Sequence, residues 1–212
     1  FIVCKQVKAS HTYHCIMAIT YNLATVNKLD MRSIFDDFTN QKYNLPETKA
    51  TLDTLHLKSK KFTHADIQYR IMKYDKRRLA PETIASSGLF RSVIFNGNQI
   101  RAFSPPKSVP ADTFTENNTP SDVFAEEFIE GTMINVFFVP EIGDNGDWEI
   151  STRSGVGGRM TYFQNGAIRA EDTFRYMFLE ACNAVNLSFD SLDRSCCYTF
   201  VLQHPKNRMV VP

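Results

Sequence analysis

Two segments, FRSVIFNGNQIRAFS at residues 90–104 and EGTMINVFFVPEIGDNGDWEISTRS at residues 130–154, decide the fold. In each of them, apolar and polar residues alternate on both sides of a turn, Asn96-Gly97-Asn98 in the first and GDNGD in the second. This alternation predicts β-strands, and Asn-Gly is the strongest short signal for a hairpin turn. The two segments therefore predict β-hairpins at Leu89–Ser104 and Phe128–Arg153.

Two further elements complete the expected fold. CCYTFVLQHPKNRMVV predicts a third hairpin, Cys197–Val211, and DTFRYMFLEACN predicts a helix at Asp172–Asn183 because its apolar residues recur at helical spacing. Hairpins and a helix packed on one face give an α+β fold with a largely antiparallel sheet. The side chains expected in its core are Val93, Phe95, Met133 or Ile134, and Val136.

The N-terminal part of the chain differs in character. We expect residues 1–80 to form a helix-leaning, basic region and residues 81–212 to form the domain that contains the hairpins. The run HLKSKKFTHADIQYRIMKYDKRR, residues 56–78, mixes many cations with aromatic residues. It is interpreted either as an amphipathic helix with a solvated charged face or as a nucleic-acid-binding module, in which cations track phosphates and Tyr69 and Tyr74 stack on bases.

The composition and net charge of the chain exclude several classes of protein. The 212 residues carry a net charge of +1, so any basic surface must be local. No apolar run approaches the ~18 residues of a membrane span, and the start of the chain does not resemble a secretory signal. Five cysteines without a CxxC pair indicate reduced thiols. Cys4, His11, His14 and Cys15 lack a familiar zinc spacing, so no metal site is expected. Both ends look cut, which suggests part of a longer chain.

Four motifs carry a resemblance to a known family. They are FRSVIFNGNQIRAFSPPKSVPADTF, EGTMINVFFV, WEISTRSGVGG and TFVLQHPKNRMVV, in this order between residues 88 and 212. Together they resemble the nucleotidyltransferase domain of bacteriophage-type RNA ligases, and the EGTMIN and TRS runs resemble RNA-ligase-like proteins of large DNA viruses. The resemblance implies a ligase adenylation-domain fold whose later motifs lie beyond Pro212. It also implies RNA, another nucleic acid or viral structural proteins as partners, and the host cytoplasm or the virion as location, without secretion.

The resemblance also implies a nucleotide-binding or phosphate-binding set. Arg91 matches the family's phosphate-contacting arginine, Lys107 lies in its Pro/Lys stretch, and Arg153 matches the basic residue after the second strand. Glu130 and Gly131 match the acidic-Gly pair that contacts ribose and permits a close turn. We expect Arg91, Lys107, Glu130 and Arg153 to converge on one cleft. The alternative is that the cations are surface residues at strand ends and that Glu130 points outward.

The family's nucleophile is missing from this register. The lysine should lie two residues before Glu130, where the chain has Phe128, and a benzyl group has no lone pair with which to attack phosphorus. The glutamate of the last motif is replaced by Val201 or Gln203. We therefore predict no catalytic residue, with Lys73 in KYDK as the outside alternative, although it precedes the first hairpin.

Three functional hypotheses follow from these residues. The first is a degenerate RNA-ligase-like domain that acts in binding or as a structural, virion-associated protein, with no certain cofactor. The second is an active ATP-dependent RNA ligase that uses ATP and Mg²⁺ and has its lysine elsewhere. The third is a nucleic-acid-binding module centred on the basic run.

Overall fold

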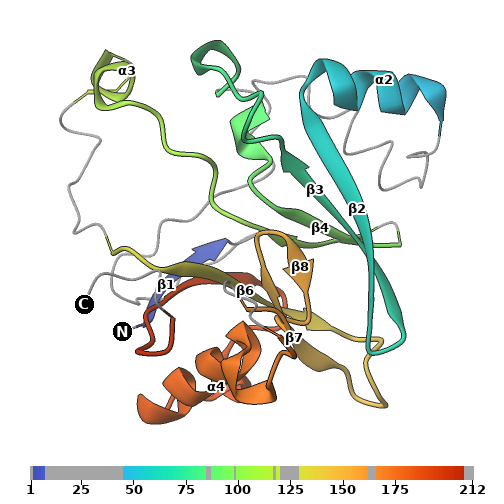
Figure 1. The fold of residues 1–212 in the computed structure, drawn as a ribbon, viewed down its shortest axis with the longest axis vertical. Helices are drawn as coiled ribbons and strands as arrows, with labels where there is room; N and C mark the ends of the chain where they lie inside the picture. Colours follow the sequence, from blue (N-terminus) through green and yellow to red (C-terminus); the bar gives the residue numbers. More distant parts are fainter. Residues whose placement is uncertain are drawn as a thin grey trace.

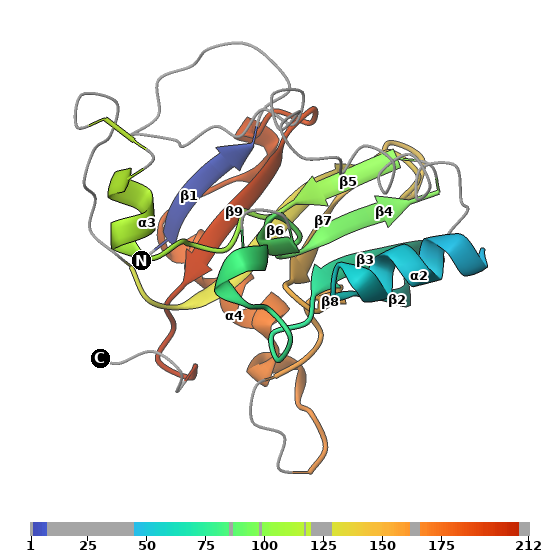
Figure 2. The same cartoon turned by 90° about the horizontal axis from the view of Figure 1, so that it is seen from above.

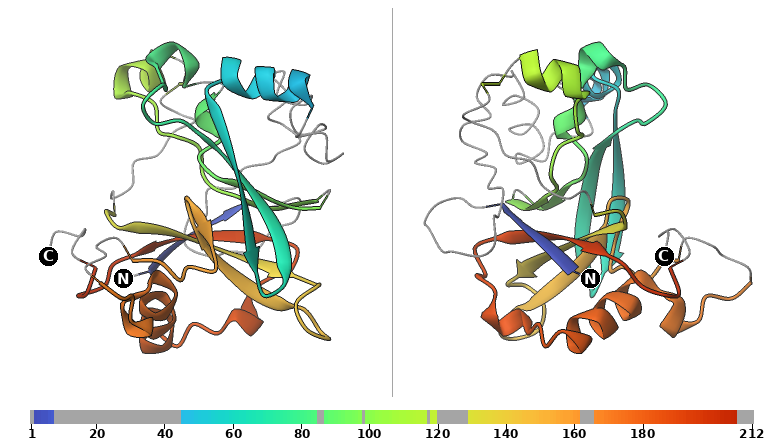
Figure 3. Two further views of the ribbon diagram at one scale, coloured as in Figure 1. Left: turned by 45° about the vertical axis from the view of Figure 1, so that its right-hand side comes forward. Right: turned by 90° about the vertical axis from the view of Figure 1, so that its left-hand side faces the viewer.

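A computed structural model describes residues 2–7, 45–84, 87–97, 99–116, 118–119, 129–161 and 166–207. Within these ranges the chain forms two antiparallel β-sheets and a few helices, which is a mixed α+β architecture (Figure 1). The two sheets stack face to face, and helices cover their outer sides (Figures 2 and 3). The predicted α+β class with antiparallel pairing is confirmed at this level.

The strands divide between the sheets as follows. The five-stranded sheet has the order β1 (Ile2–Val7), β9 (Cys197–Leu202), β6 (Thr132–Val139), β7 (Asp147–Thr152) and β8 (Gly155–Val156). The four-stranded sheet has the order β2 (Leu57–His64), β3 (Ile67–Tyr74), β4 (Val93–Asn96) and β5 (Gln99–Phe103). The α-helices are α2 (Pro46–Thr54), α3 (Ala111–Glu116) and α4 (Phe174–Ala184), and the short 3-10 helices are η2 (Pro81–Thr83), η3 (Ser87–Leu89), η5 (Ala170–Asp172) and η6 (Phe189–Ser191).

Three apolar clusters hold these layers together. One lies between α4 and the five-stranded sheet, and a second lies between α2 and the outer face of the four-stranded sheet. The third lies between the sheets, where Phe137 of β6 packs edge-on against Tyr69 of β3 with ring centroids 6.2 Å apart. β6 therefore buries side chains on both of its faces, with Ile134 and Val136 toward α4 and Phe137 and Val139 toward the other sheet, as stacked sheets require.

The first two predicted hairpins and the helix are confirmed in the described residues. β4 pairs with β5 and β6 pairs with β7, and the expected core residues Val93, Phe95, Ile134 and Val136 are all buried. The predicted helix appears as α4, whose Thr173 cap accepts a hydrogen bond from the backbone N–H of Tyr176 at 3.3 Å. Its buried stripe packs on the five-stranded sheet.

The expectation of one sheet built from three hairpins is wrong. The hairpins belong to different sheets, and β9 is paired on both sides, with β1 and with β6, which excludes a hairpin with the segment that follows it. Sequence alternation identifies a strand but not its partner, and here one partner comes from the opposite end of the sequence. Arg208 and the rest of the expected return strand lie outside the described residues.

The helical interpretation of the basic run is also wrong. Residues 57–74 form the β2–β3 hairpin, which turns at Ala65 and Asp66, both with positive φ. One face of the hairpin buries Tyr69 and Ile71 against the five-stranded sheet. This buried alternation prevails over the helical preference of the lysines and arginines, which is a weak effect.

The four-stranded sheet also crosses the domain boundary expected at residue 80, because β2 and β3 pair with strands from the following region. None of the helices in the described ranges has the length and apolar character needed to cross a membrane.

A buried charge network joins the two sheets. Glu149 of β7 is 1% exposed, and its carboxylate accepts hydrogen bonds from Arg175 of α4 at 3.0 Å and from the backbone N–H of Ile150 at 2.7 Å. Its second oxygen pairs with Nδ1 of His64 at the end of β2. Gly157 faces the His64 ring, where a Cβ would approach ring carbon to 2.7 Å. The network thus ties β2, β7 and α4 together.

Candidate functional site

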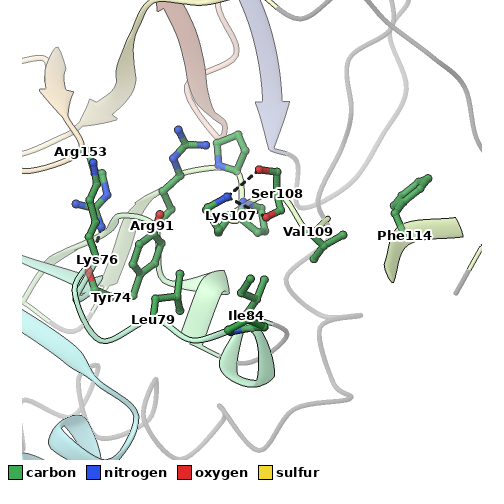
Figure 4. Close-up of a pocket in the computed structure, with 13 residues that line it drawn as sticks. Tyr74, Lys76, Leu79, Ile84, Arg91, Lys107, Ser108, Val109, Phe114 and Arg153 are labelled. Atoms are coloured by element: carbon green, nitrogen blue, oxygen red, sulfur yellow. Dashed lines mark hydrogen bonds between the residues drawn. The ribbon is translucent and has the colours of Figure 1, made fainter. Parts of the chain in front are cut away.

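A cleft of about 960 Å³ lies where the loops after β3 and β5 meet the end of β7 (Figure 4). Its lining comes from segments that are far apart in the sequence. The lining residues are Tyr74, Lys76, Leu79, Pro81, Ile84, Arg91, Pro105, Pro106, Lys107, Ser108, Val109, Phe114 and Arg153. A cleft of this size falls in the range of small-molecule sites.

The charged residues in the described lining of the cleft are all cations. Four cations line it, Lys76 after β3, Arg91 before β4, Lys107 after β5 and Arg153 after β7, and its lining within the described residues includes no carboxylate. Asp75, which lies close enough to favour the charged form of Arg153, is paired with Lys58 at 2.6 Å. Converging cations without a neutralising partner create a local positive potential that favours an anionic ligand.

Arg153 is the most firmly placed of these cations. Its guanidinium lies over the Tyr74 ring, 4.5 Å from the centroid, and one Nη donates to the Tyr74 carbonyl at 3.0 Å. Its Nε is buried and has no hydrogen-bond partner among the described residues. Burial lowers the pKa of Arg153, and nearby Arg91 adds to this effect. Two guanidiniums from different sheets therefore face the same space.

Lys107 closes the other side of the cleft. Its backbone N–H donates to the Gly88 carbonyl at 2.9 Å, which anchors the Pro/Lys stretch beside η3. Its exposed ammonium contacts only Ser108 among the described residues, through the hydroxyl at 3.0 Å and the carbonyl at 3.1 Å. These local contacts leave the charge in the cleft, as Figure 4 shows.

The remaining wall is apolar. Leu79 and Ile84 lie on one side, and Val109 and Phe114 extend it toward α3, where both side chains are exposed (Figure 4). A cleft with a cationic end and an apolar, partly aromatic end suits a ligand that joins a phosphate to a flat ring. Nucleotides have this composition.

The structure brings together three of the four residues that were expected to converge. Arg91, Lys107 and Arg153 line the cleft, whereas Glu130 is exposed and does not. The Glu130 carbonyl accepts a hydrogen bond from the Gln203 amide at 2.9 Å. Gly131 follows it where β6 approaches β9, and a Cβ at Gly131 would lie 2.6 Å from the Leu202 carbonyl oxygen. In the described structure this pair therefore fixes strand packing.

The last motif is also structural in the described residues. Val201 pairs with Met133 in the sheet, and Asn207 is buried, where its amide donates to the Thr132 hydroxyl at 2.8 Å. Gly157 and Gly158 adopt positive φ, but they pack against His64 and Arg175 and lie outside the lining of the cleft.

The structure describes only one of the two candidate nucleophile positions, Lys73. Phe128 lies outside the described residues, so its assignment to the nucleophile position stays a prediction. Lys73 lies on β3 and not on a helix, and its ammonium donates to the Ser154 hydroxyl at 2.6 Å, next to Arg153. Lys73 is not among the lining residues of the cleft.

Sequence reasoning did not single out Lys76, Tyr74 and Phe114 as residues of this cleft. Lys76 and Tyr74 were placed on an expected helix, and recognising the β2–β3 hairpin would have put them at the end of a strand. Phe114 lies on α3, a helix that the sequence patterns did not predict.

Mg²⁺, which the family resemblance implies for an active enzyme, is usually held by one or two carboxylates together with substrate phosphates. The described lining of the cleft supplies no carboxylate, so these residues do not fit a Mg²⁺ site.

Comparisons of the chain with protein-family models, with curated proteins and with solved structures find no match.

Proposed function

We propose that this chain is a degenerate RNA-ligase-like domain that binds a nucleotide, or the phosphate end of a nucleic acid, without forming a covalent intermediate. One observation carries the proposal: Arg91, Lys107, Arg153 and Lys76 line a single cleft that has an apolar wall and no carboxylate in its described lining. The virion of a large DNA virus is the setting that the resemblance suggests, where such a domain would serve as a binding or structural component.

Equilibrium binding tests the proposal directly. We expect the protein to bind ATP more tightly than adenosine, because only ATP carries the phosphates that the cations would contact. Arg153→Gln should weaken ATP binding roughly 10- to 100-fold, since a hydrogen bond to a charged group contributes about 1.5–3 kcal/mol. Fluorescence anisotropy or calorimetry at fixed salt measures this. Lys61→Gln is the control, because exposed Lys61 lies on β2 and does not line the cleft.

Two results would contradict the binding proposal. One is equal affinity for ATP and adenosine, and the other is an Arg153→Gln variant that binds ATP as the wild type does. Because Arg153 also packs on Tyr74, the variant's unfolding midpoint should be measured beside its affinity, so that a loss of folding is not mistaken for a loss of contact.

The alternative function is an active ATP-dependent RNA ligase whose lysine lies outside the family register. The observation that favours it is the position of Lys73, whose amine lies beside Ser154 and the cleft residue Arg153. Nucleotidyl transfer requires an amine in line with the leaving pyrophosphate, roughly 3–3.5 Å from phosphorus. Lys73 is not among the described lining residues, and those residues do not provide the carboxylates that a metal-assisted transfer uses.

Incubation with ATP labelled at the α-phosphate separates the two functions. We expect no acid-labile, base-stable adduct on the protein, because Phe128 occupies the nucleophile position in the motif register and Lys73 is not among the described residues that line the cleft. Phe128→Lys alone should not restore labelling, because the glutamate of the last motif is replaced as well. A phosphoramidate mapped to Lys73 in the wild type would establish the active alternative.

A further inference from the structure

The half-buried amine of Lys73 lies in a group of cations. Lys58 is its direct partner across the β2–β3 hairpin, and Lys60 lies two residues further along the same face of β2. Arg153 approaches from β7, and Lys76 follows on the same chain segment; all four act on the charge of Lys73. One of these cations, Lys58, forms an ion pair with Asp75.

The contacts of Lys73 suit a neutral amine. No carboxylate in the described structure lies within ion-pair distance of its Nζ, and its hydrogen-bond partner is the Ser154 hydroxyl at 2.6 Å. A hydroxyl can accept a hydrogen bond from an ammonium and can donate one to a neutral amine, so this contact persists in both protonation states. Burial lowers the pKa of Lys73, and Arg153 and the three lysines lower it further. Because the pKa is lowered, more of this amine is unprotonated at neutral pH than of an ordinary lysine.

We propose that Lys73 is a covalent capture site for carbonyl compounds that carry a phosphate group. The surrounding cations would hold the phosphate while the amine adds to the carbonyl carbon. This inference rests on the proposed function, because it uses Arg153, which lines the cleft and also acts on the charge of Lys73, although Lys73 itself is not among the lining residues. It adds a chemical class of ligand and a reacting atom that reversible nucleotide binding does not involve.

The step balances without any further reagent. The Nζ lone pair forms a bond to the carbonyl carbon, and the carbonyl oxygen takes up a proton to give a carbinolamine. The nitrogen then loses its remaining proton as the hydroxyl leaves as water, so that amine and carbonyl become an imine and one water molecule. Nothing is oxidised or reduced, and no metal is required. The Ser154 hydroxyl, 2.6 Å from Nζ, is placed to pass a proton during the loss of water.

Pyridoxal 5′-phosphate, an aldehyde with a phosphate group, is a suitable probe. The protein is incubated with it near neutral pH, the imine is reduced with borohydride, and the labelled lysines are mapped by peptide mass spectrometry. We expect Lys73 to be labelled several-fold faster than Lys61, which is exposed on the opposite face of the β2–β3 hairpin. The part of this advantage that comes from the lowered pKa of Lys73 should disappear at high pH, where both amines are neutral, and the part that comes from the phosphate contacts should remain.

Matched controls separate the contribution of the phosphate group from that of the Lys73 amine. Pyridoxal, which lacks the phosphate, should need a roughly 10- to 100-fold higher concentration for equal labelling of Lys73, given the strength of charge-assisted contacts. Lys73→Arg keeps the charge and a donor to Ser154, so it should fold and bind ATP but lose the adduct. Lys61→Arg should leave the labelling of Lys73 unchanged.

The outcomes distinguish this inference from the proposed function. If ATP binding holds but Lys73 is labelled no faster than Lys61, or equally well by pyridoxal and its phosphate, the inference is overturned while the binding function stands. If neither ATP nor the phosphorylated aldehyde shows a preference for the cleft, the proposed function fails as well. Preferential, phosphate-dependent labelling of Lys73 that is lost in Lys73→Arg supports both.

Discussion

Glu149→Gln is expected to destabilise the folded protein by about 3 kcal/mol, at the lower end of the ~3–5 kcal/mol typical when one partner of a buried ion pair is removed. The carboxylate is 1% exposed and serves both Arg175 and His64, so its neutral replacement leaves the Arg175 charge without a counter-ion. The Arg175 side chain is 28% exposed, and partial solvation limits the loss. Urea unfolding followed by tryptophan fluorescence measures it, since Trp148 precedes Glu149 on β7.

Glu141→Gln provides the matched control. Glu141 also pairs with a residue of the four-stranded sheet, Arg101 of β5, but its side chain is 47% exposed. Exposed ion pairs contribute about 0–1 kcal/mol, so this variant should unfold almost as the wild type does. Similar losses in the two variants would show that the His64–Glu149–Arg175 network has no special role in joining the sheets.

Phe137→Ala is expected to cost about 3–5 kcal/mol of unfolding free energy and also to weaken ATP binding by the protein that remains folded. Phe137 is fully buried between the sheets and contacts the Tyr69 ring. Arg91 precedes a strand of one sheet and Arg153 follows a strand of the other, so the inter-sheet core sets their separation. A cavity there should let the two cations move relative to each other. The measurement combines urea unfolding with an ATP titration in the absence of denaturant.

Phe178→Ala separates packing from binding. Phe178 is also fully buried, but it packs between α4 and the five-stranded sheet, on the side away from the cleft. The same loss of volume should therefore destabilise the protein to a similar extent and leave the ATP affinity of the folded state unchanged. If both variants lose affinity equally, the inter-sheet core does not control the geometry of the cleft.

The sequence patterns correctly predicted those structural features that depend on neighbouring residues. The Asn96-Gly97 turn and the alternating residues around it produced the β4–β5 hairpin, and the stripe of Phe174, Met177 and Phe178 produced α4. Three cations that the motif resemblance selected also line one cleft. These features depend on neighbouring residues or on a motif register, both of which can be read along the chain.

Features that depend on distant partners could not be read in this way. The cations of residues 58–78 suggested a helix, because the burial of Tyr69 and Ile71 depends on a second sheet that lies elsewhere in the sequence. The pairing of β9 with β1 was missed for the same reason. The acidic-Gly pair was assigned to a ligand, whereas Gly131 is constrained by the approach of the Leu202 backbone, which only the sheet register reveals.

The pairing of β1 with β9 has a consequence for how the protein forms during synthesis. Ile2 lies opposite Leu202, so the first described strand hydrogen-bonds to a segment that leaves the ribosome almost two hundred residues later. Contacts of such wide sequence separation form slowly, because a long loop must close before they stabilise the chain. The four-stranded sheet uses only residues 57–103 and can assemble first. β1 must wait unpaired until β9 emerges, and over that interval it is open to pairing with other chains or to capture by a chaperone.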